Sequence, residues 1–271
     1  MIAGDRRAQL LELVRRQGFA PLPDLAKALE VSESTIRRDL AHLEREGSAQ
    51  RTHGGVFYTG PSPNLPHFEL RQSNQWDKKR AIARTAAELI ADYDAVLIDG
   101  GTTAYEVARL LVGRPLQVVT NSLPVATLFS AAPGADLIMV GGYVHARSST
   151  TQGPHAESMF RSLSVRRAVI SAAGVTERGL FNTNLQTAAA QQAMLDAAEE
   201  VVAVIDSTKF GHQSLALVCE LGRIDRMVVD DELTPQWRDR LAAAGIELTL
   251  TPTIDASVAT EEDQGDASPT E

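Results

Sequence analysis

Hydrophobic residues recur at helical spacing three times within the first 50 positions, which predicts three short helices. Gly18 ends the first helical pattern. The second pattern runs from residue 22 to residue 29, and Pro23 is compatible with it because a helix tolerates proline in its first turn. The third begins after Ser32, whose hydroxyl can cap a helix by accepting a backbone N–H, and ends at Gly47. Loose alternation around two glycines in 48–58 then predicts a small two-stranded wing. The apolar positions of the three helices are Leu10, Leu11, Val14, Leu22, Leu25, Ala26, Leu29, Ile36, Leu40 and Leu43.

From about residue 76 the pattern changes, and amphipathic helical stretches alternate with short apolar runs. That rhythm predicts βαβ units and a mainly parallel sheet. We therefore expect an α/β protein in which a small helical unit is followed by a larger Rossmann-like α/β domain. The apolar runs lie at 95–99, 116–120, 136–140, 167–171, 201–206 and 226–230.

Two segments lack any sustained hydrophobic period. Residues 58–75 contain three prolines, which predicts a linker. From 255 onward the chain has six acidic residues and no basic ones, which is typical of a disordered, solvated tail. The expected parts are an N-terminal domain at 1–57, a linker at 58–75, a larger domain at 76–254 and a tail at 255–271.

Composition adds three constraints. No stretch approaches the roughly 18 consecutive apolar residues of a membrane span, and no signal peptide is visible, so we expect a cytoplasmic protein with no membrane partner. The net charge of −9 disfavours nucleic acid, but residues 1–57 hold nine basic and eight acidic residues, so any DNA binding is confined to that segment. The one cysteine, Cys219, has apolar neighbours and is predicted to be a buried structural thiol.

The third helix has an exposed face that could contact DNA. With its leucines and isoleucine turned inward, Ser34 and Arg38 point outward, flanked by Thr35 and Arg37. Small hydroxyls can bond bases or phosphates, and an arginine can bond guanine O6 and N7 bidentately. Spacing alone supports a merely solvated helix face about as well, because adjacent arginines on helices are common.

The run VSESTIRRDLAHLEREG followed by RTHGG resembles the signature of the DeoR family of bacterial transcriptional regulators, and the resemblance covers residues 5–56. The resemblance implies a winged helix-turn-helix domain, in which the helix-turn-helix motif itself spans about residues 20–39. It also implies that Arg37 and Arg38 contact DNA and that Arg51 and His53 lie in the wing, near the DNA backbone. Double-stranded operator DNA is then the expected partner. The candidate DNA-binding residues are Ser32, Ser34, Thr35, Arg37, Arg38, Arg51 and His53.

Polar and glycine-rich turns follow several apolar runs of the larger domain, where open parallel sheets bind ligands. After the first run, two glycines permit close backbone approach, and Thr102 and Thr103 open a helix whose free N–H groups favour an anion. Lys209 follows the fifth run and could pair with a phosphate. Neither GxxxxGK[ST] nor GxGxxG occurs, which disfavours a nucleoside triphosphate or a dinucleotide. A phosphorylated small metabolite is the expected ligand.

The resemblance to the DeoR family extends over about residues 76–231, where DxGTT, VTNS, a GG turn, Gly153 and DSTKFG occur in the family's order. The family's C-terminal domain is similar to sugar-phosphate isomerases and senses phosphorylated sugars or related intermediates. No cofactor is implied, and the scattered histidines predict no metal site. The candidate effector-binding residues are Asp99, Gly100, Gly101, Thr102, Thr103, Asn121, Ser122, Gly141, Gly142, Gly153 and Lys209.

Two departures from the family pattern concern the effector. First, many relatives carry an EEAxxKR run; this chain has Thr187 in place of an acid of that run and Gln191-Gln192 in place of its Lys-Arg. Second, Arg166 replaces the aspartate that usually precedes the fourth strand. The rival hypothesis, a sugar-phosphate isomerase carrying a DNA-binding module, is weakened because enolisation needs a positioned base. A triad with Ser148 and His145 lacks the GxSxG elbow. We expect a non-enzymatic, homo-oligomeric repressor.

Overall fold

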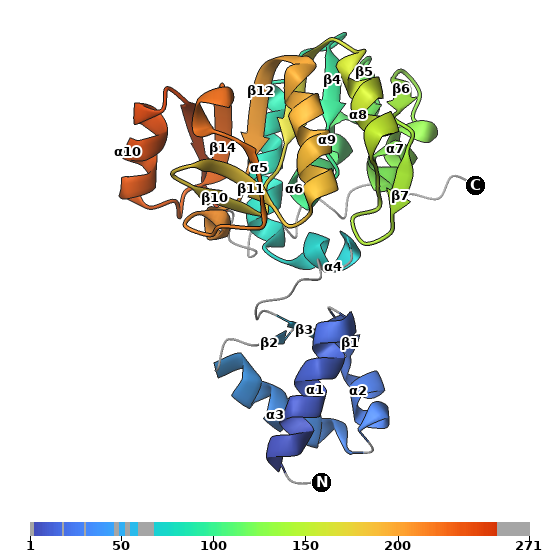
Figure 1. Cartoon of the computed structure of the whole chain (residues 1–271), viewed down its shortest axis with the longest axis vertical. Helices are drawn as coiled ribbons and strands as arrows, with labels where there is room; N and C mark the ends of the chain where they lie inside the picture. Colours follow the sequence, from blue (N-terminus) through green and yellow to red (C-terminus); the bar gives the residue numbers. More distant parts are fainter. Residues whose placement is uncertain are drawn as a thin grey trace, which may run out of the picture. The chain divides into compact units, whose positions relative to one another are not determined.

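The computed structural model describes residues 3–17, 19–29, 31–45, 49–51, 55–58 and 68–253. The chain divides into two compact units, residues 1–71 and residues 72–271 (Figure 1). Each unit has a hydrophobic core of its own. In the described part of the chain, no helix is both long and apolar enough to cross a membrane.

The first unit is a winged helix-turn-helix. The three predicted helices are confirmed, and their apolar stripes meet in one core in which Leu10, Ile36 and Leu40 are fully buried. The wing differs from the prediction, because a third strand, β1, pairs antiparallel with β3. A three-residue strand carries too little alternation to be predicted from sequence. The elements are α1 (Ala3–Gln17), β1 (Phe19–Pro21), α2 (Leu22–Ala28), α3 (Glu33–Arg45), β2 (Ala49–Arg51) and β3 (Gly55–Tyr58).

The second unit is built on a seven-stranded sheet in the order β15-β14-β12-β9-β4-β5-β6, in which every neighbouring pair is parallel. The six predicted apolar runs all form strands of this sheet. The seventh, β15, was missed because it lies at an edge and alternates polar with half-buried residues. The strands are β4 (Ala95–Ile98), β5 (Gln117–Thr120), β6 (Asp136–Met139), β9 (Val165–Ile170), β12 (Ala198–Val204), β14 (Arg226–Asp230) and β15 (Glu247–Thr251).

Helices cover both faces of this sheet (Figure 1). Alternate residues of the central strands point to opposite faces, so Val96 and Ile98 pack under α5, α6 and α7, whereas Leu97 packs under the helices of the other face. This three-layer arrangement buries the sheet and leaves its carboxyl edge as the place where turns meet. One face carries α5 (Trp76–Glu88), α6 (Thr102–Leu111) and α7 (Leu123–Ser130), and the other carries α8 (Pro154–Arg161), α9 (Leu185–Asp196) and α10 (Pro235–Ala243).

The second unit also contains short strands and 3-10 turns outside the seven-stranded sheet, and the hydrophobic pattern predicted none of them. They have three or four residues each, and several are rich in polar side chains. A hairpin is formed by β7 (Tyr143–His145) and β8 (Thr150–Gln152), and a small sheet by β10 (Gly174–Thr176), β11 (Gly179–Asn182) and β13 (Ala216–Cys219). Two 3-10 turns are η1 (Ser207–Lys209) and η2 (Leu221–Arg223).

The segment 58–75, predicted to be a linker, is partly helical. Helix α4 (Phe68–Ser73) lies within it, and Tyr58 belongs to β3. The three prolines that suggested a linker all precede Phe68, so the helix starts only where no proline interrupts it, and Phe68 is buried. Residues 59–67 and the predicted tail at 255–271 lie outside the described residues.

Cys219 lies at the end of β13 and is buried, as its apolar neighbours predict. Burial raises the pKa of its thiol to about 11. At pH 8 the thiolate fraction is then on the order of one in a thousand. We expect iodoacetamide to leave Cys219 unmodified in the folded protein and to alkylate it once urea unfolds the chain, as mass spectrometry can measure. Rapid alkylation of the native protein would contradict this placement.

Candidate functional site

The amino end of α3 gathers hydroxyl groups. Ser32 caps the helix, because its Oγ accepts the backbone N–H of Thr35 at 3.3 Å. The same Oγ lies 2.8 Å from the hydroxyl oxygen of Ser34 and 2.9 Å from that of Thr35. Ser32 and Ser34 are exposed. The three hydroxyls therefore form one exposed polar cluster at the end of the helix that would enter a major groove.

The two arginines of α3 differ in their surroundings. Both are exposed, but Arg37 lies 3.4 Å from the carboxylate of Glu33, one turn earlier. Arg38 makes no ion pair with any residue that the structure describes. Its guanidinium is therefore available to a partner. The side chain of Arg51 and the whole of His53, the predicted wing contacts, lie outside the described residues.

The position of α3 is fixed by an ion pair to α1. The Arg6 guanidinium meets the Asp39 carboxylate with two contacts, Nε to Oδ2 at 2.6 Å and Nη2 to Oδ1 at 3.3 Å. Asp39 is buried, whereas the preceding residue, Arg38, is exposed. A two-point pair of this kind sets both the distance and the orientation of the helices. It holds the exposed face of α3 in one orientation.

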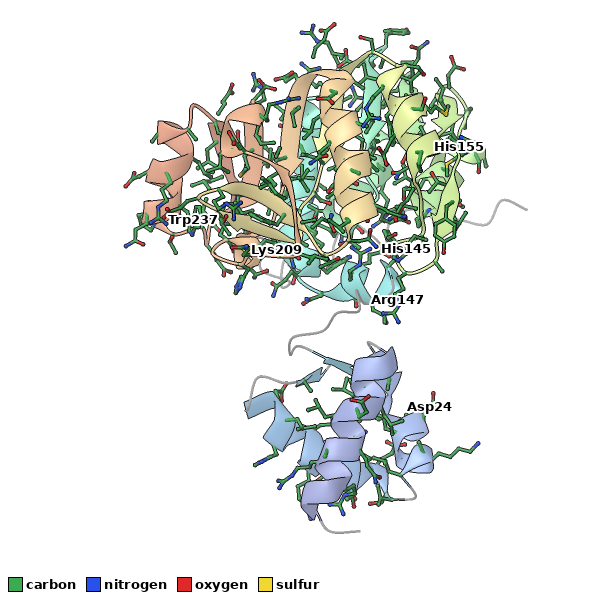
Figure 2. The ribbon with its side chains drawn as sticks, in the orientation of Figure 1. Asp24, His145, Arg147, His155, Lys209 and Trp237 are labelled. Carbon is green, nitrogen blue, oxygen red and sulfur yellow. The ribbon has the colours of Figure 1, made fainter. Side chains whose placement is uncertain are left out.

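In the second unit, the predicted turns come together at the carboxyl edge of the parallel sheet. Asp99, Asn121 and Gly141 follow β4, β5 and β6, which are neighbours in the sheet, and Ser171 follows β9 on the other side of β4. Lys209 ends the turn after β12, which is two strands from β4, a spacing of about 10 Å between those strands. Figure 2 shows Lys209 and His145 along the same edge of this unit.

Several of the helices that start at this edge, α5 and α10 among them, have N-terminal N–H groups without a side-chain cap. Ser122 caps α7 and Asn184 caps α9 through their side chains, whereas α6 and α8 begin at Gly101 and Gly153 with no side-chain cap. Uncapped helix ends attract anions through these N–H groups and the helix dipole. Lys209 is half-buried and makes no ion pair within the described residues. These groups together favour a negatively charged ligand.

The glycines of the first turn have a packing role that the sequence did not predict. A Cβ atom on Gly100 would lie 2.1 Å from the methyl carbon of Thr150, and one on Gly101 would lie 1.6 Å from the hydroxyl of Ser171. Both positions must therefore be glycine for β8 and the end of β9 to approach. Gly153 has open space around it and a φ of 92°, which favours glycine.

Asp99 is held by a network of neutral donors. Its Oδ2 accepts the hydroxyl of Ser171 at 2.7 Å, the backbone N–H of Ser171 at 3.2 Å and Nε2 of Gln191 at 3.1 Å. Gln191 is 1% exposed, and its Oε1 accepts a bond from Asn182 at 3.0 Å. Three donors to one carboxylate oxygen fix the side chain without a cation. Asp99 thus adds a rigid negative charge beside the start of α6.

The turn that carries Lys209 is anchored by a buried ion cluster. The Lys78 ammonium lies 2.8 Å from the Ser207 hydroxyl, 3.1 Å from Asp230 and 2.7 Å from Glu232. Burial alone would lower the pKa of Lys78, but hydrogen bonds to Glu232 and Asp230 outweigh it and raise that pKa. Asp230 also accepts the backbone N–H and the hydroxyl of Ser207. The cluster joins α5 to the ends of β12 and β14.

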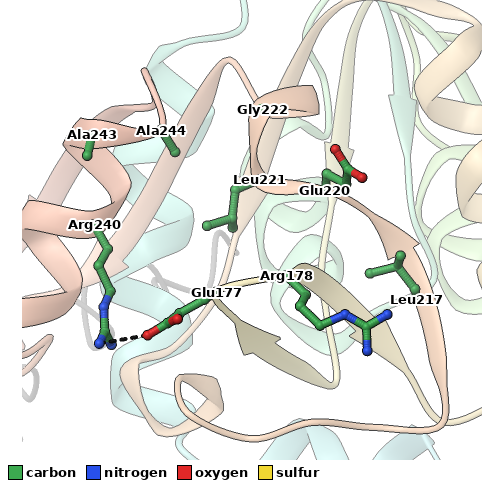
Figure 3. A pocket seen from close by; sticks show the side chains of 9 residues that line it. All are labelled: Glu177, Arg178, Leu217, Glu220, Leu221, Gly222, Arg240, Ala243 and Ala244. Carbon is green, nitrogen blue, oxygen red and sulfur yellow. Dashed lines mark ion pairs between the residues drawn. The ribbon is translucent and has the colours of Figure 1, made fainter.

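A separate surface pocket of about 640 Å³ lies between α10, η2 and the β10–β11 hairpin. Figure 3 shows Arg240 and Glu177 pointing toward each other across it, with 2.7 Å between guanidinium and carboxylate. The predicted effector residues lie elsewhere, at the carboxyl edge of the sheet. The residues that line the pocket are Glu177, Arg178, Leu217, Glu220, Leu221, Gly222, Arg240, Ala243 and Ala244.

Both units match known families. The model of the DeoR-like helix-turn-helix domain matches residues 6–60, and that of the DeoR C terminal sensor domain matches residues 74–231. The chain belongs to the DeoR family. This DeoR-family chain is therefore a DNA-binding transcriptional regulator with a sensor domain, and the resemblance drawn from its sequence is confirmed.

Relatives match over nearly the whole length of this DeoR-family chain. A protein of Escherichia coli O157:H7, provisionally named as the aga operon transcriptional repressor, is 33% identical over 91% of this chain and 93% of its own. The regulator UlaR of Salmonella arizonae is 29% identical over 92% of this chain and 99% of its own. The solved structure of ribose 5-phosphate isomerase A from Methanocaldococcus jannaschii is far more distant, with 18% identity, a TM-score of 0.38 and coverage of 51% and 55% of the two chains.

The departures of this DeoR-family chain from the family pattern have different consequences. Gln191 replaces a basic residue and supplies an amide donor to Asp99, and Thr187 replaces an acid and bonds Gln152 at 2.7 Å. Both therefore lie at the carboxyl edge. Arg166, which was expected to alter the effector chemistry, lies near the amino end of β9 in an exposed ion pair with Glu199. Arg166 therefore lies away from the carboxyl edge, since the amino ends of the strands form the opposite edge of the sheet.

The sequence interpretation of this DeoR-family regulator missed the contribution of β8. Its three residues are polar and all buried, so no apolar run marks the strand. Ser148, just before it, bonds the Thr150 hydroxyl at 2.7 Å and Nδ1 of His145 at 2.8 Å. Ser171 could have been found, because it directly follows a predicted strand as Asp99 and Asn121 do. No sequence signal identified Gln152.

Proposed function

We propose that this DeoR-family regulator represses a carbohydrate-metabolism operon and that a phosphorylated sugar or related metabolite, bound at the carboxyl edge of the sheet, changes its affinity for operator DNA. Two uncapped helix starts, those of α6 and α8, and the ammonium of Lys209, which makes no ion pair within the described residues, lie along that edge and carry the effector part of the proposal. The exposed hydroxyls and Arg38 of α3 support the DNA part. The relative named as the aga operon transcriptional repressor supports repression of an operon.

An isomerase activity is the weaker alternative. Enolisation needs a positioned base, and the position where relatives carry an acid holds the hydroxyl of Thr187, which is engaged by Gln152. The pair of Ser148 and His145 does form, but the Ser148 hydroxyl is buried and shared with Thr150. We propose that the chain acts by binding rather than by catalysis. Aldose–ketose interconversion by the purified protein would support the alternative.

Thermal-shift screening tests the effector proposal most economically. We expect phosphorylated sugars or sugar alcohols, but not their unphosphorylated forms, to raise the melting temperature. A ligand at 100 times its Kd stabilises the folded state by about 2.7 kcal/mol.

We also propose that the protein binds operators as a homo-oligomer, because helix-turn-helix proteins read two-fold sites as dimers. Light scattering measures the oligomeric state directly.

Lys209→Ala should weaken effector binding while leaving operator binding intact. Losing a charge-assisted bond to phosphate costs about 1.5–3 kcal/mol, so the effector Kd should rise about 12-fold to 150-fold. Titration calorimetry with the compound found by screening measures this change. Arg223→Ala is the matched control, since Arg223 is an exposed cation in η2 whose pair with Asp196 is solvated.

Two results would count against this role of Lys209. An effector Kd equal to that of the wild type would remove the ammonium from the site. Loss of operator binding in the absence of any effector would indicate that Lys209 supports the structure instead. Electrophoretic mobility shifts of the wild type, Lys209→Ala and Arg223→Ala distinguish the two.

A further inference from the structure

Two buried amide side chains at the carboxyl edge have oxygen atoms without hydrogen-bond donors. Asn121 is 3% exposed and Gln152 is 1% exposed. Within the part of the chain that the structure describes, Oδ1 of Asn121 and Oε1 of Gln152 have no partner. A buried acceptor without a donor costs about 1–3 kcal/mol. A ligand bound at this edge of the sheet would supply donors to both atoms.

The orientation of the Asn121 amide is fixed by its surroundings. Its Nδ2 donates to the backbone carbonyl oxygen of Thr151 at 2.7 Å. A carbonyl cannot donate, so exchanging the amide nitrogen and oxygen would place two acceptors against each other. The backbone N–H of Thr151 in turn donates to the carbonyl of Asn121 at 2.8 Å. Oδ1 is therefore a rigid acceptor.

The Gln152 amide is held by hydroxyl groups from two elements. Its Nε2 lies 2.7 Å from the Thr187 hydroxyl of α9, and 3.3 Å and 3.4 Å from those of Thr150 and Ser148. Thr150 and Ser148 also bond each other at 2.7 Å. With the nitrogen end surrounded by these oxygens, Oε1 is the end of the amide that has no neighbour to bond.

Gln152 lies on the side of β8 that packs against the turn after β4, which contains Asp99 and Gly100. Residues two apart in a strand point to the same face, so Gln152 and Thr150 share a face. The Thr150 methyl group packs on Gly100, directly after Asp99. Asn121 follows β5, the neighbour of β4 in the sheet, so the two unpaired oxygens and the carboxylate of Asp99 belong to adjacent turns of the carboxyl edge.

We infer that Asn121 and Gln152 determine effector specificity by accepting hydrogen bonds from the end of the ligand that is remote from its phosphate. This inference rests on the proposed function. The ligand is then a phosphorylated sugar or sugar alcohol whose hydroxyl groups donate to Oδ1 and Oε1. A phosphorylated sugar acid is rejected, because its carboxylate has no proton to donate and would meet two bare acceptors and the negative charge of Asp99.

Matched ligands test this selectivity on the full-length protein. Glucitol 6-phosphate and 6-phosphogluconate differ only in a CH₂OH or a carboxylate at the far end, and the mannitol and galactitol compounds give equivalent pairs. We expect the sugar alcohol of any pair that binds to do so at least tenfold more tightly than its acid, by titration calorimetry. Inorganic phosphate, followed by thermal shift, reports the anion-binding groups alone.

Gln152→Met keeps an unbranched side chain of similar volume and removes the acceptor. We expect it to weaken binding of the sugar alcohol phosphate about tenfold, to move the ratio of alcohol to acid toward one, and to leave the response to inorganic phosphate unchanged within twofold. If Gln152→Met does not fold, Thr187→Val is the second variant. It removes the hydroxyl that holds Nε2 of Gln152 and is expected to change binding in the same direction. Gln192→Met, at an exposed position of α9, is the matched control and should change nothing.

The outcomes separate this inference from the proposed function. If the sugar acid binds as tightly as its alcohol, or if Gln152→Met leaves the ratio unchanged, the inference is overturned while a phosphorylated effector stands. If none of the phosphorylated compounds and no inorganic phosphate bind, the proposed effector class and the inference are both overturned.

Discussion

Replacing Lys78 with methionine is expected to lower the free energy of unfolding of the sensor domain by about 3–5 kcal/mol, the cost of leaving a buried charge without its partner. Asp230 is fully buried, and the Lys78 ammonium at 3.1 Å is its cation. The hydrogen bonds that Asp230 accepts from Ser207 do not neutralise it. Because Ser207 begins the turn that ends in Lys209, the same substitution should also weaken effector binding.

Urea unfolding followed by circular dichroism measures this loss. Glu232→Gln is the matched control, because Glu232 is 61% exposed and its pair with Lys78 is largely solvated, so we expect it to cost less than about 1 kcal/mol. Adding Asp230→Asn to Lys78→Met should restore part of the stability by removing the uncompensated charge. Wild-type stability of Lys78→Met would show that the cluster does not stabilise the fold.

The pH dependence of this cluster follows from the direction of its pKa shift. The folded protein raises the pKa of Lys78 above its ordinary value of 10.5. A raised pKa means that the contribution is fully present below about pH 10 and is lost only as the pH rises through the folded value. The difference in stability between wild type and Lys78→Met should therefore be constant across neutral pH.

Arg38→Ala is expected to cost about 1–3 kcal/mol in affinity for the specific operator, a loss of about fivefold to 150-fold, if Arg38 bonds a base edge. Arg38 is exposed on α3, and no described residue forms an ion pair with it. Arg37 already lies 3.4 Å from Glu33, so its guanidinium is less available. Binding to a scrambled duplex should change much less than binding to the operator.

Fluorescence anisotropy on an operator selected from a random duplex library, with a scrambled duplex beside it, measures both affinities at several salt concentrations. Arg161→Ala, an exposed arginine of α8 in the sensor domain, is the control and should affect neither duplex. An equal loss on both duplexes would identify Arg38 as a phosphate contact, which lowers the salt slope by about one. No loss at all would show that α3 is not the recognition helix.

The sequence predicts the fold where hydrophobic periodicity is long enough to be read. Three amphipathic stripes and six apolar runs became helices and strands because each segment buries a face in a core. The wing strand β1, the edge strand β15 and the hairpin strand β8 were missed, since three to five residues are too few for a periodic signal to stand out. Helix α4 was missed because the prolines beside it dominated the interpretation.

The site is predicted in part for the same physical reason. Turns that directly follow parallel strands must meet at one edge of the sheet, so Asp99, Asn121 and Lys209 could be placed together from sequence alone. What the pattern cannot reveal is which polar groups satisfy one another. That Gln191 fixes Asp99 and that Gln152 retains an unpaired oxygen depends on contacts between segments far apart in the sequence.

The operator Kd, measured with and without a saturating phosphorylated compound that stabilises the protein, tests the central claim most directly. A regulator whose sensor domain is coupled to its DNA-binding domain should show a change of about 1–3 kcal/mol, which is fivefold to 150-fold in Kd. By reciprocity, operator DNA must change the affinity for the compound by the same factor. An operator Kd that is identical at zero and at saturating compound would contradict the proposal that the ligand controls DNA binding.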